Sequence, residues 1–567
     1  MEDKSKLIEE LFEKGILISK DFLESEQTED FSKKIEMEED LLVINTDYAN
    51  VMKQQSTLVD WYELDKHRVE SEKERNDDLY KTELQSIKKT SLSIEQNEKE
   101  QEVSSFKAEL NKDKIESNFS SEETTENKEE SSLEISALIK EPKITKIIHS
   151  SIEILINYEN KPFKYKVKDF ANIFVSRYKF LERILRTRQE LNGMASINRV
   201  LDKKEKETVS IIGIIEEVGI TRGGHLMLTL EDLTGKIKVL VSKNNKALFE
   251  EAKDIIPDEI IGIMGKSADK IIFAEKLVWP DIPGTREMKT SPIDEHAIFL
   301  SDLHVGSKLF LMEEFQKFLS WIRGESGTEV QREIAEKAKY IVIAGDLVDG
   351  IGIYPSQESE LAITTIEGQY NEFCRLIKQI PKDKQIIICP GNHDMVHLAE
   401  PQPICYKEFS QELHEMENVT LITNPGVIKI GKTKDFSGFE VLMYHGYSFD
   451  YYVANVESIR NNGGYHRADL IMKFLLKRRH LAPSFKSTPY FPGHKEDPLL
   501  IRSIPDFFIT GHIHYSKVAN YKGVTMISGS CWQAKTSFQE KLGHEPEPAR
   551  VPVVNLKTRA IKILKFI

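Results

Sequence analysis

The chain has 567 residues, of which 40% are hydrophobic and 30% are charged, a balance typical of a soluble protein with some unstructured sequence. No apolar run approaches the roughly 18 residues that a membrane span needs, and the opening MEDKSKLIEELFEKG is too acidic for a signal or transit peptide. The composition therefore argues against secretion and membrane insertion. The four cysteines form no CxxC pair, so we expect reduced thiols in a cytoplasmic protein.

The net charge of −14 is concentrated in the N-terminal quarter of the chain. Residues 1–140 hold 20 Lys and Arg against 37 Asp and Glu (20 − 37 = −17), whereas the rest holds 58 against 55 (58 − 55 = +3). The larger part is therefore compatible with a polyanionic substrate. Because 12 of the 15 histidines lie at or beyond His296, metal ligands are to be sought there.

The length suggests roughly three to four domains. Residues 1–70 are predicted to form a small helical domain, because apolar side chains such as Leu7 and Leu11 recur at helical spacing. Residues 71–140 are predicted to be an acidic, disordered linker. Positions 81–130 contain 13 acidic and 8 basic side chains, and such sequence cannot bury enough apolar surface to offset its ordering entropy. A transient charged helix is the alternative for this segment.

Residues 141–200 are predicted to form a basic helical connector, with a helix over 169–199. Its basic side chains include Arg177, Arg183, Arg186 and Arg188. We expect them on the charged outer face of an amphipathic helix, and a phosphate-contacting face is the sharper alternative.

Residues 201–288 contain the short β-rich runs SIIGIIEEV, HLMLTLED and KIKVLV, with turn signals at Arg222–Gly224 and Thr234–Gly235. Several strands in so short a segment predict a small closed barrel, and the pattern resembles an OB-fold. OB-folds bind single-stranded nucleic acid or serve as scaffolds, and both readings stay open at this point.

The last segment, residues 289–567, alternates β-rich runs with helical stretches such as Glu313–Ile322 and Glu367–Ile380, which predicts an α/β sheet. Five apolar runs in it each end at a polar motif: Asp302-Leu303-His304, Asp346 to Asp349, Asn392-His393-Asp394, His445, and His512-Ile513-His514. Loops at the carboxyl ends of strands gather at one edge of such a sheet, so we expect these motifs to meet. Imidazole, carboxylate and amide donors without thiolates suit a pair of divalent ions such as Mn²⁺, Fe²⁺ or Zn²⁺.

The order D-x-H, GD, GNH[DE], H, GHxH resembles the calcineurin-like metallophosphoesterase superfamily, which implies a C-terminal α/β sandwich with two divalent metal ions. The resemblance implies a first metal site of Asp302, His304, Asp346 and His514, and a second of Asp346, Asn392, His445 and His512. By the same resemblance Asp346 bridges both ions, and His393 faces the scissile phosphate as proton donor or charge stabiliser. Asp349 and Asp394 are expected to orient their loops through hydrogen bonds.

A narrower resemblance comes from FLSDLHVGS, GNHDMVHLAEPQP, LLKRRHLAP and IPDFFITGHIH, which are similar to the small subunits of archaeal family-D DNA polymerases over roughly residues 140–567. It implies a heterodimer with a large polymerising subunit and a 3′→5′ proofreading exonuclease that acts on a single-stranded or frayed 3′ DNA end. It also implies a cytoplasmic, nucleoid-associated protein, with a sliding clamp as a further candidate partner. The alternatives are a free-standing repair nuclease or phosphatase and a structural subunit with residual activity.

Two further features of this segment leave their role open. A dense basic run contains Lys473, Lys477, Arg478, Arg479 and His480. It is either a solvated helix end or a contact with DNA or an acidic partner surface. Three tyrosines, Tyr451, Tyr452 and Tyr465, are predicted either to stack on a frayed base or to pack in the core.

Overall fold

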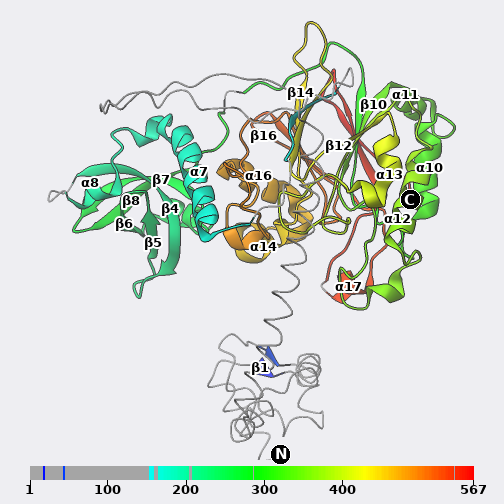
Figure 1. Cartoon of the computed structure of the whole chain (residues 1–567). Coiled ribbons are helices and arrows are strands. Elements are labelled where there is room, and N and C mark those ends of the chain that lie inside the picture. Colours follow the sequence, from blue (N-terminus) through cyan, green and yellow to red (C-terminus); the bar gives the residue numbers. More distant parts are fainter. Residues whose placement is uncertain are drawn as a thin grey trace, which may run out of the picture. The chain divides into compact units, whose positions relative to one another are not determined.

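The computed structural model describes residues 17–18, 43–44, 152–158, 164–202, 207–284, 286–541 and 543–567, and the chain divides into two units, Met1–Glu134 and Ile135–Ile567 (Figure 1). In the first unit, strands β1 (Leu17–Ile18) and β2 (Val43–Ile44) pair in parallel. Apart from these strands, the predicted helical domain (1–70) and acidic linker (71–140) lie outside the described residues. The second unit contains everything that bears on the candidate site.

A five-stranded closed barrel forms the first part of the second unit. Its strands, in the order β4-β5-β6-β8-β7, are β4 (Thr208–Ile220), β5 (Leu226–Glu231), β6 (Lys236–Val241), β7 (Ile260–Ala268) and β8 (Ile271–Val278). Side chains alternate in burial along β5, so that Leu228 and Leu230 point into the barrel core. Helices α8 (Ile197–Leu201) and α9 (Lys246–Ala252) pack onto the same core. The prediction of a small closed barrel is confirmed.

Helix α7 (Val167–Arg186) precedes the barrel and begins where the backbone N–H of Lys166 donates to Asp169. The predicted helix extended to residue 199, but α7 ends at Arg186 and a 3₁₀ turn, η2 (Gln189–Leu191), follows. The placement of Arg177 on an outer face was wrong. Its guanidinium is buried, and its Nε lies 2.6 Å from the carboxylate of Asp497.

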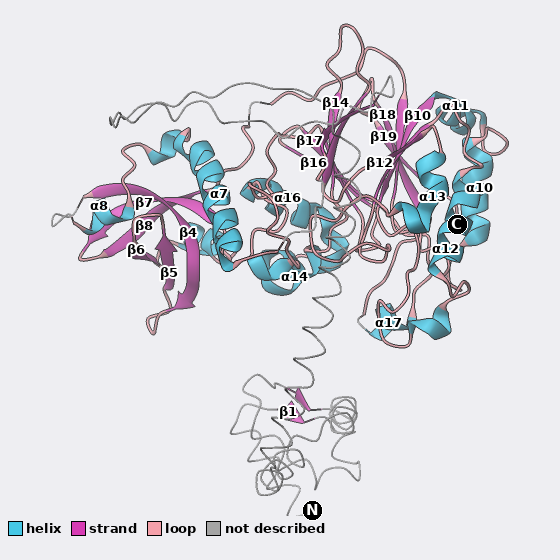
Figure 2. Cartoon of the chain, in the orientation of Figure 1, coloured by secondary structure: helices cyan, strands magenta, loops and turns pink. Residues whose placement is uncertain are grey.

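Two six-stranded sheets face one another in the remainder of the unit (Figure 2). The first, in the order β12-β11-β10-β9-β18-β19, contains β9 (His296–Leu300), β10 (Ala338–Ala344), β11 (Gln385–Cys389), β12 (Val419–Leu421), β18 (Arg550–Asn555) and β19 (Ile561–Lys565). The second, in the order β16-β17-β15-β14-β13-β3, contains β3 (Ile152–Ile156), β13 (Gly426–Ile430), β14 (Phe439–Met443), β15 (Phe507–Thr510), β16 (Lys517–Tyr521) and β17 (Val524–Ser528). Phe299 and Val342 of the first sheet share one buried core with Val441 and Phe507 of the second.

Helices cover the outer faces of both sheets (Figure 1). Those packed on the first are α10 (Met312–Ile322), α11 (Glu329–Lys337), α12 (Ile366–Ile377) and α13 (Lys407–Glu415). Those packed on the second are α14 (Phe449–Asn455), α15 (Glu457–Asn461) and α16 (Ala468–Arg478). A short helix, α17 (Ser537–Lys541), follows β17. The predicted mixed α/β architecture and its helices near 313–322 and 367–380 are confirmed.

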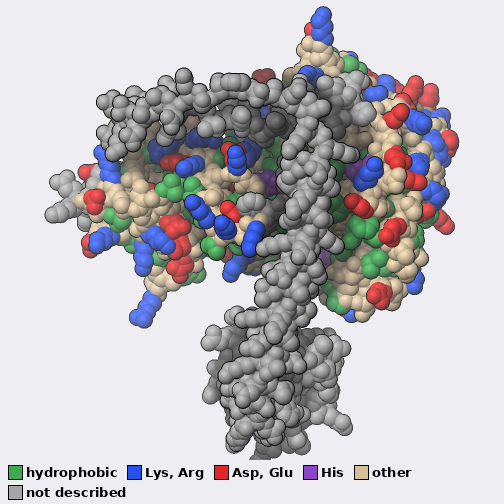
Figure 3. All heavy atoms as spheres, viewed as in Figure 1, with side chains coloured by type: hydrophobic (Ala, Val, Ile, Leu, Met, Phe, Trp, Pro, Cys, Tyr) green, Lys and Arg blue, Asp and Glu red, His purple; other side chains and the backbone are tan. Residues whose placement is uncertain are grey.

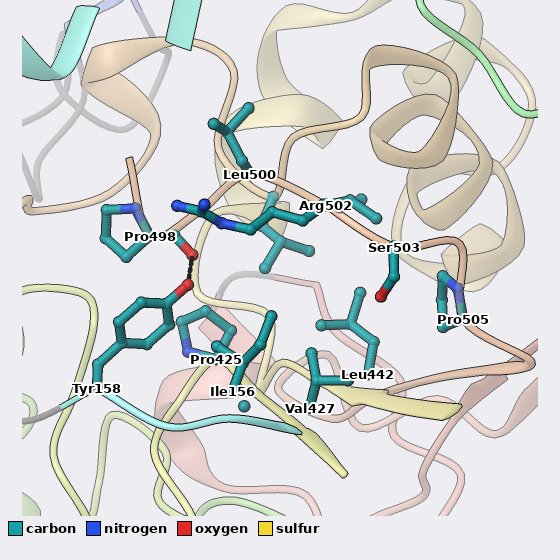
Figure 4. Close-up of a pocket in the computed structure, with 13 residues that line it drawn as sticks. Ile156, Tyr158, Pro425, Val427, Leu442, Pro498, Leu500, Arg502, Ser503 and Pro505 are labelled. Atoms are coloured by element: carbon teal, nitrogen blue, oxygen red, sulfur yellow. Dashed lines mark hydrogen bonds between the residues drawn. The ribbon is translucent and has the colours of Figure 1, made fainter. Parts of the chain in front are cut away.

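Strand β3 comes from the segment that was predicted to be a helical connector. It pairs antiparallel with β13, more than 260 residues later in the chain, and forms an edge of the second sheet. The segment 141–200 therefore contributes to the two-sheet part as well as to the barrel side. A small hollow beside β3 is lined mainly by apolar side chains, and Tyr158 donates to the carbonyl of Pro498 across it at 2.9 Å (Figure 4).

The four cysteines are all buried and unpaired, as expected from their spacing. Among the helices of the described part of the chain, we find none with the length and apolar character to cross a membrane.

Candidate metal centre

The loops that follow β9 and β10 are joined to one another by backbone hydrogen bonds. The N–H of Asp302 donates to the carbonyl of Gly345 at 2.9 Å, and the N–H of His304 donates to that of Asp346 at 3.1 Å. Carboxylates complete the connection, since Asp302 accepts from the N–H of His512 at 2.9 Å. The polar motifs that the sequence analysis singled out therefore meet at one edge of the sheets.

Three groups of potential ligands lie close together at this edge. They are Asp302, His304 and His514; His304, Asp346 and His393; and Asp346, His445 and His512, and within each group the candidate donor atoms lie within 4.8 Å of one another. Asp346 and His304 each belong to two groups. Oδ2 of Asp346 lies 3.2 Å from Nε2 of His445 and 3.9 Å from Nε2 of His304, so this carboxylate stands between the two ends of the cluster.

The ring of His445 indicates where one cation would fit. Its Nδ1 lies 2.8 Å from the carbonyl oxygen of Ala344 and can only donate there. Its Nε2 faces Oδ1 of Asn392 at 3.0 Å and Oδ2 of Asp346 at 3.2 Å, and both of these oxygens are acceptors. Three lone pairs that converge in this way need a cation or a proton between them. Burial disfavours a proton on the ring, but the carboxylate of Asp346 outweighs burial and raises the pKa of His445 to about 10.

His512 repeats this arrangement on the other side of Asn392. Its Nε2 lies 2.9 Å from the carboxylate of Asp450, which holds a proton on that nitrogen. Its Nδ1 lies 2.9 Å from Oδ1 of Asn392, again a lone pair against an acceptor. The amide oxygen of Asn392 is thus met by a ring nitrogen from each of two histidines.

At the other end of the cluster, Nε2 of His304 lies 3.0 Å from Nε2 of His514. The carboxylate of Asp349, 3.2 Å from Nδ1 of His304, favours a proton on that nitrogen and leaves the Nε2 lone pair turned toward His514. Burial, with the neighbouring His304, holds the pKa of His514 well below its ordinary value. With Oδ1 of Asp302 3.6 Å from His514, these residues also fit a divalent cation.

The two central carboxylates differ in protonation behaviour. Burial, reinforced by the nearby charge of Asp346, raises the pKa of Asp302. Asp346 is equally buried, but the adjacent His445 and His393 outweigh burial and hold its pKa well below the usual range. The charge of Asp346 is therefore the most persistent negative charge of the cluster.

Backbone strain is concentrated at the same positions. Five non-glycine site residues adopt positive φ angles: Asp302 (51°), His304 (54°), Asp346 (52°), His512 (72°) and His514 (56°). Such conformations cost of the order of 1 kcal/mol or more each and persist where the surroundings enforce them, typically at functional sites.

Two glycines of the motifs are required by close approach. A Cβ at Gly391 would lie 2.2 Å from Oδ1 of Asp346, and a Cβ at Gly345, where φ is +85°, would lie 2.4 Å from Nδ1 of His445. Neither position can carry a larger side chain without displacing a candidate ligand.

His393 lies in the cluster, and its ring is held by a hydrogen bond from Nδ1 to the backbone of Asp349. Its backbone N–H donates to Oδ1 of Asp346 at 2.8 Å, and its Nδ1 donates to the carbonyl of Asp349 at 2.7 Å. Nε2, the other ring nitrogen, is not held by a backbone carbonyl in this way. Burial lowers the pKa of His393. The structure thus brings His393 beside the candidate ligands, with its ring centroid 4.6 Å from that of His304.

Asp349 and Asp394, which were expected to orient their loops, both accept hydrogen bonds from neighbouring segments. The carboxylate of Asp394 accepts from the N–H groups of Leu347 and Gly391 and from the hydroxyl of Tyr370. Burial and the charge of Asp346 raise the pKa of Asp394 to about 7.

Several functional partners were missed by the sequence analysis. Besides Asp450, they are Gln533 and Gln357, which donate to Asp349, and Gln539, whose amide lies 2.9 Å from Nδ1 of His514. None of them belongs to a motif or follows a strand directly, so no spacing in the sequence distinguishes them from ordinary polar residues.

The basic run at the end of α16 does not form an exposed DNA-binding surface. Arg478 and Arg479 are only 3% and 4% exposed. Arg478 lies 2.5 Å from the carboxylate of Glu259 in the barrel segment, and Arg479 donates to the carbonyls of Ile501 and Arg502. The proposed contact of these two arginines with DNA or a partner was therefore wrong, because both hold internal structure together.

The other members of the run are also engaged, and even the exposed Lys473 has its Nζ 5.5 Å from the centroid of the Tyr521 ring. Lys477 lies 3.6 Å above the ring of Trp279 and 3.0 Å from Glu251, and His480 is buried against Asp497. Lys473 is exposed, so a contact of this residue with DNA or a partner stays a prediction. On the face seen in Figure 3, basic and acidic side chains are interspersed over the barrel.

The three tyrosines are not equivalent. Tyr452 is fully buried and bonded to Ser487, so it belongs to the core and is unavailable to a base. Tyr451 and Tyr465 are half-buried, the first against Ser484 and the second 4.3 Å from the ring of His544.

Known proteins are similar in sequence to the part of the chain that contains the candidate metal centre. Residues 297–518 match the B-subunit family of DNA polymerases alpha and epsilon. The "DNA polymerase II small subunit" of Methanothermobacter thermautotrophicus is 37% identical over 415 residues, which cover 73% of this chain and 83% of that protein. The protein of the same description from Archaeoglobus fulgidus is 40% identical over 391 residues, 68% of this chain and 75% of that one.

These similarities extend over most of both chains, and they confirm the family resemblance seen in the sequence motifs. The chain belongs to the family of archaeal DNA polymerase II small subunits.

Proposed function

We propose that this chain is the proofreading subunit of a heterodimeric replicative DNA polymerase and hydrolyses DNA phosphodiesters from the 3′ end with two divalent metal ions. The observation that carries the proposal is the gathering of buried imidazole nitrogens, carboxylate oxygens and an amide oxygen at both ends of Asp346. Ring nitrogens of His445 and His512 meet the amide oxygen of Asn392, and those of His304 and His514 meet each other at 3.0 Å. A purely structural subunit has no need for buried groups arranged in this way.

In this proposal, the first ion is held by Asp302, His304, Asp346 and His514, and the second by Asp346, Asn392, His445 and His512. The nitrogen and oxygen donors favour Mn²⁺, with Fe²⁺ or Zn²⁺ as alternatives. When bound, such ions neutralise charge on the phosphodiester and activate water for attack. Asp346 lies between both sites, and its low pKa keeps it ionised to lower the repulsion between two cations.

His393 is proposed to face the phosphate. Its Nδ1 is engaged by the carbonyl of Asp349, so its Nε2 is the atom that would donate to a phosphate or leaving-group oxygen. The peptide N–H of the same residue holds Asp346 at 2.8 Å, which fixes the ring beside the cluster. A charged or hydrogen-bonding donor in this position would stabilise the negative charge that develops during hydrolysis.

The two parts of the fold suit these roles. The two-sheet part, with strand ends that deliver the candidate ligands, is proposed to be a calcineurin-like phosphoesterase sandwich, and the closed barrel an OB-fold. The name "small subunit" of the relatives supports a large polymerising subunit as partner. A frayed or single-stranded 3′ end is the proposed substrate, whereas the sliding clamp and a nucleoid-associated location stay predictions.

The test uses the full chain together with its large subunit. The two are expected to co-purify, and the complex is expected to remove a mismatched 3′ nucleotide in Mn²⁺ and to stop when the metal is chelated. A complex that forms normally but leaves the mismatch intact in Mn²⁺ would leave only the structural role. A chain that hydrolyses DNA without ever binding a large subunit would instead indicate a free-standing nuclease.

A further inference from the structure

Exposed apolar side chains occur on the segments that surround the candidate metal centre. Of the 16 large apolar side chains exposed in the described residues, four belong to these loops and a fifth to helix α17, and each of the five is between 38% and 44% exposed. They are Ile351 and Ile353 after Asp349, Met395 and Leu398 after His393, and Phe538 before Gln539. We call these five residues the apolar rim. Exposed apolar side chains on the segments around a site are typical of an interaction surface.

Hydrogen bonds tie the rim to the metal centre. The N–H of Ile353 donates to Gln357 at 2.9 Å, and the Gln357 amide in turn donates to the carbonyl of Asp349 at 2.8 Å. On helix α17, Gln539, next to Phe538, contacts His514 at 2.9 Å. Anything that rests on the rim is therefore held at a defined distance from the candidate ligands.

An aromatic pair joins the loop that follows Asp349 to helix α17. The rings of Tyr354 and Phe538 stack with their centroids 5.3 Å apart and an interplanar angle of 17°. Tyr354 is itself anchored, because its hydroxyl donates to Glu360 at 2.9 Å. The exposed ring of Phe538 is consequently held in a fixed orientation beside the metal centre.

We propose that the apolar rim, with Phe538 as its aromatic member, stacks on the unpaired nucleobases of the strand whose phosphodiester enters the metal centre. This inference rests on the proposed function and adds the part of the substrate that is recognised. Aromatic and apolar side chains bind the faces of bases only where those bases are unpaired, so the rim would select single-stranded over paired ends.

A protein partner fits the same observations less well. A folded protein seated on the rim would lie across the loops of Asp349, His393 and Gln539 and obstruct the metal centre. A DNA strand, in contrast, must pass these loops to bring a phosphate to the ligands. The rim side chains carry no charge, so they suit the bases of that strand, and its phosphates would be bound elsewhere.

The experiment measures binding of an oligothymidylate to the full chain in the presence of a chelator, so that no hydrolysis occurs. A second probe is the same strand with abasic residues at its 3′ end. Phe538→Ala is expected to weaken binding of the first probe about five-fold or more and to leave the second unchanged, and Phe538→Trp is expected to restore it. Ile351→Ala should weaken binding as well, whereas Ile563→Ala, equally exposed at 43% but on β19, should not.

The inference would be overturned if Phe538→Ala bound the oligothymidylate as tightly as the unaltered chain does. So would a Phe538→Ala variant that binds DNA normally but no longer co-purifies with the large subunit, because the rim would then be a protein interface. Failure of the proposed function looks different. The unaltered chain would show base-dependent binding in chelator but no hydrolysis after addition of Mn²⁺.

Discussion

The carboxylate of Asp450 lies 2.9 Å from Nε2 of His512 and fixes that ring with its other nitrogen turned toward Asn392. Partners of this kind set the tautomer of a metal-binding histidine. We expect Asp450→Ala to weaken the second metal site about 10- to 100-fold, measured by Mn²⁺ titration. Asp469→Ala, which breaks the pair with Arg467 at the start of α16, is the control and should bind Mn²⁺ normally. Unchanged Mn²⁺ affinity in the Asp450 variant would show that this contact does not support the site.

His393 and His445 should respond in opposite ways to substitution. If His393 faces the phosphate, His393→Ala keeps both metal ions and loses roughly 10²- to 10⁴-fold in turnover. His445→Ala should lose the second ion and regain part of its rate when Mn²⁺ is raised. Metal content by mass spectrometry and rates at several Mn²⁺ concentrations separate the two roles. Rescue of His393→Ala by Mn²⁺, without rescue of His445→Ala, would reverse them.

Arg478 is expected to matter for stability. Its guanidinium is buried beside Glu259, and removal of one partner leaves the other charge buried alone. Arg478→Ala should lower the free energy of unfolding by about 3–5 kcal/mol in urea denaturation. The exposed Lys473 is the matched control, and Lys473→Ala should change it by no more than about 0.5 kcal/mol. An Arg478 variant with normal stability and weakened DNA binding would restore the DNA-contact interpretation.

The buried cluster of Arg177, Asp497 and His480 predicts a pH dependence of stability. Nε2 of His480 donates to Asp497 at 2.8 Å and its Nδ1 accepts from the N–H of Ala482, so the folded ring is neutral. Burial and the charge of Arg177 lower its pKa to about 4. The unfolded chain, with a histidine pKa of about 6.5, binds the extra proton, so this contribution is complete above about pH 6.5 and is lost as the pH falls toward 4.

The measurement is the urea midpoint at several pH values between about 4 and 7. Because buried carboxyls such as Asp394, with a pKa raised to about 7, act in the opposite direction, the comparison between the two proteins carries the test. Stability should rise more steeply, or fall less steeply, with pH in the unaltered chain than in His480→Gln. Equal slopes for the two proteins would mean that the folded ring titrates as an unfolded one does.

The sequence predicted the meeting of the five motifs because each follows a strand, and strand ends converge at one edge of a sheet. The regular alternation in LMLTLE likewise predicted a barrel strand with one buried face. Both predictions start from patterns that can be read within a single strand and the residues that follow it. Asp450 and Gln539 could not be found in this way, because each contacts its histidine only through the folding of a helix that carries no motif.

The density of basic residues along the sequence led to a wrong prediction of surface exposure, because burial depends on distant parts of the chain. Arg478 and Arg479 look like a surface patch in the sequence, but α16 is packed between the second sheet and the barrel segment that contains Glu259. Likewise β3 joins a sheet through pairing with β13, more than 260 residues away. Only the tertiary structure reveals such partners.

The most direct test of the two-metal proposal compares the unaltered chain with Asp346→Ala. Metal content and single-turnover removal of a mismatched 3′ nucleotide in Mn²⁺ are measured on the same samples. The proposal predicts two ions per chain and hydrolysis for the unaltered protein, and loss of both ions and of hydrolysis for the folded variant, since Asp346 stands between the sites. An Asp346→Ala protein that retains two ions and hydrolyses DNA at the unaltered rate would contradict it.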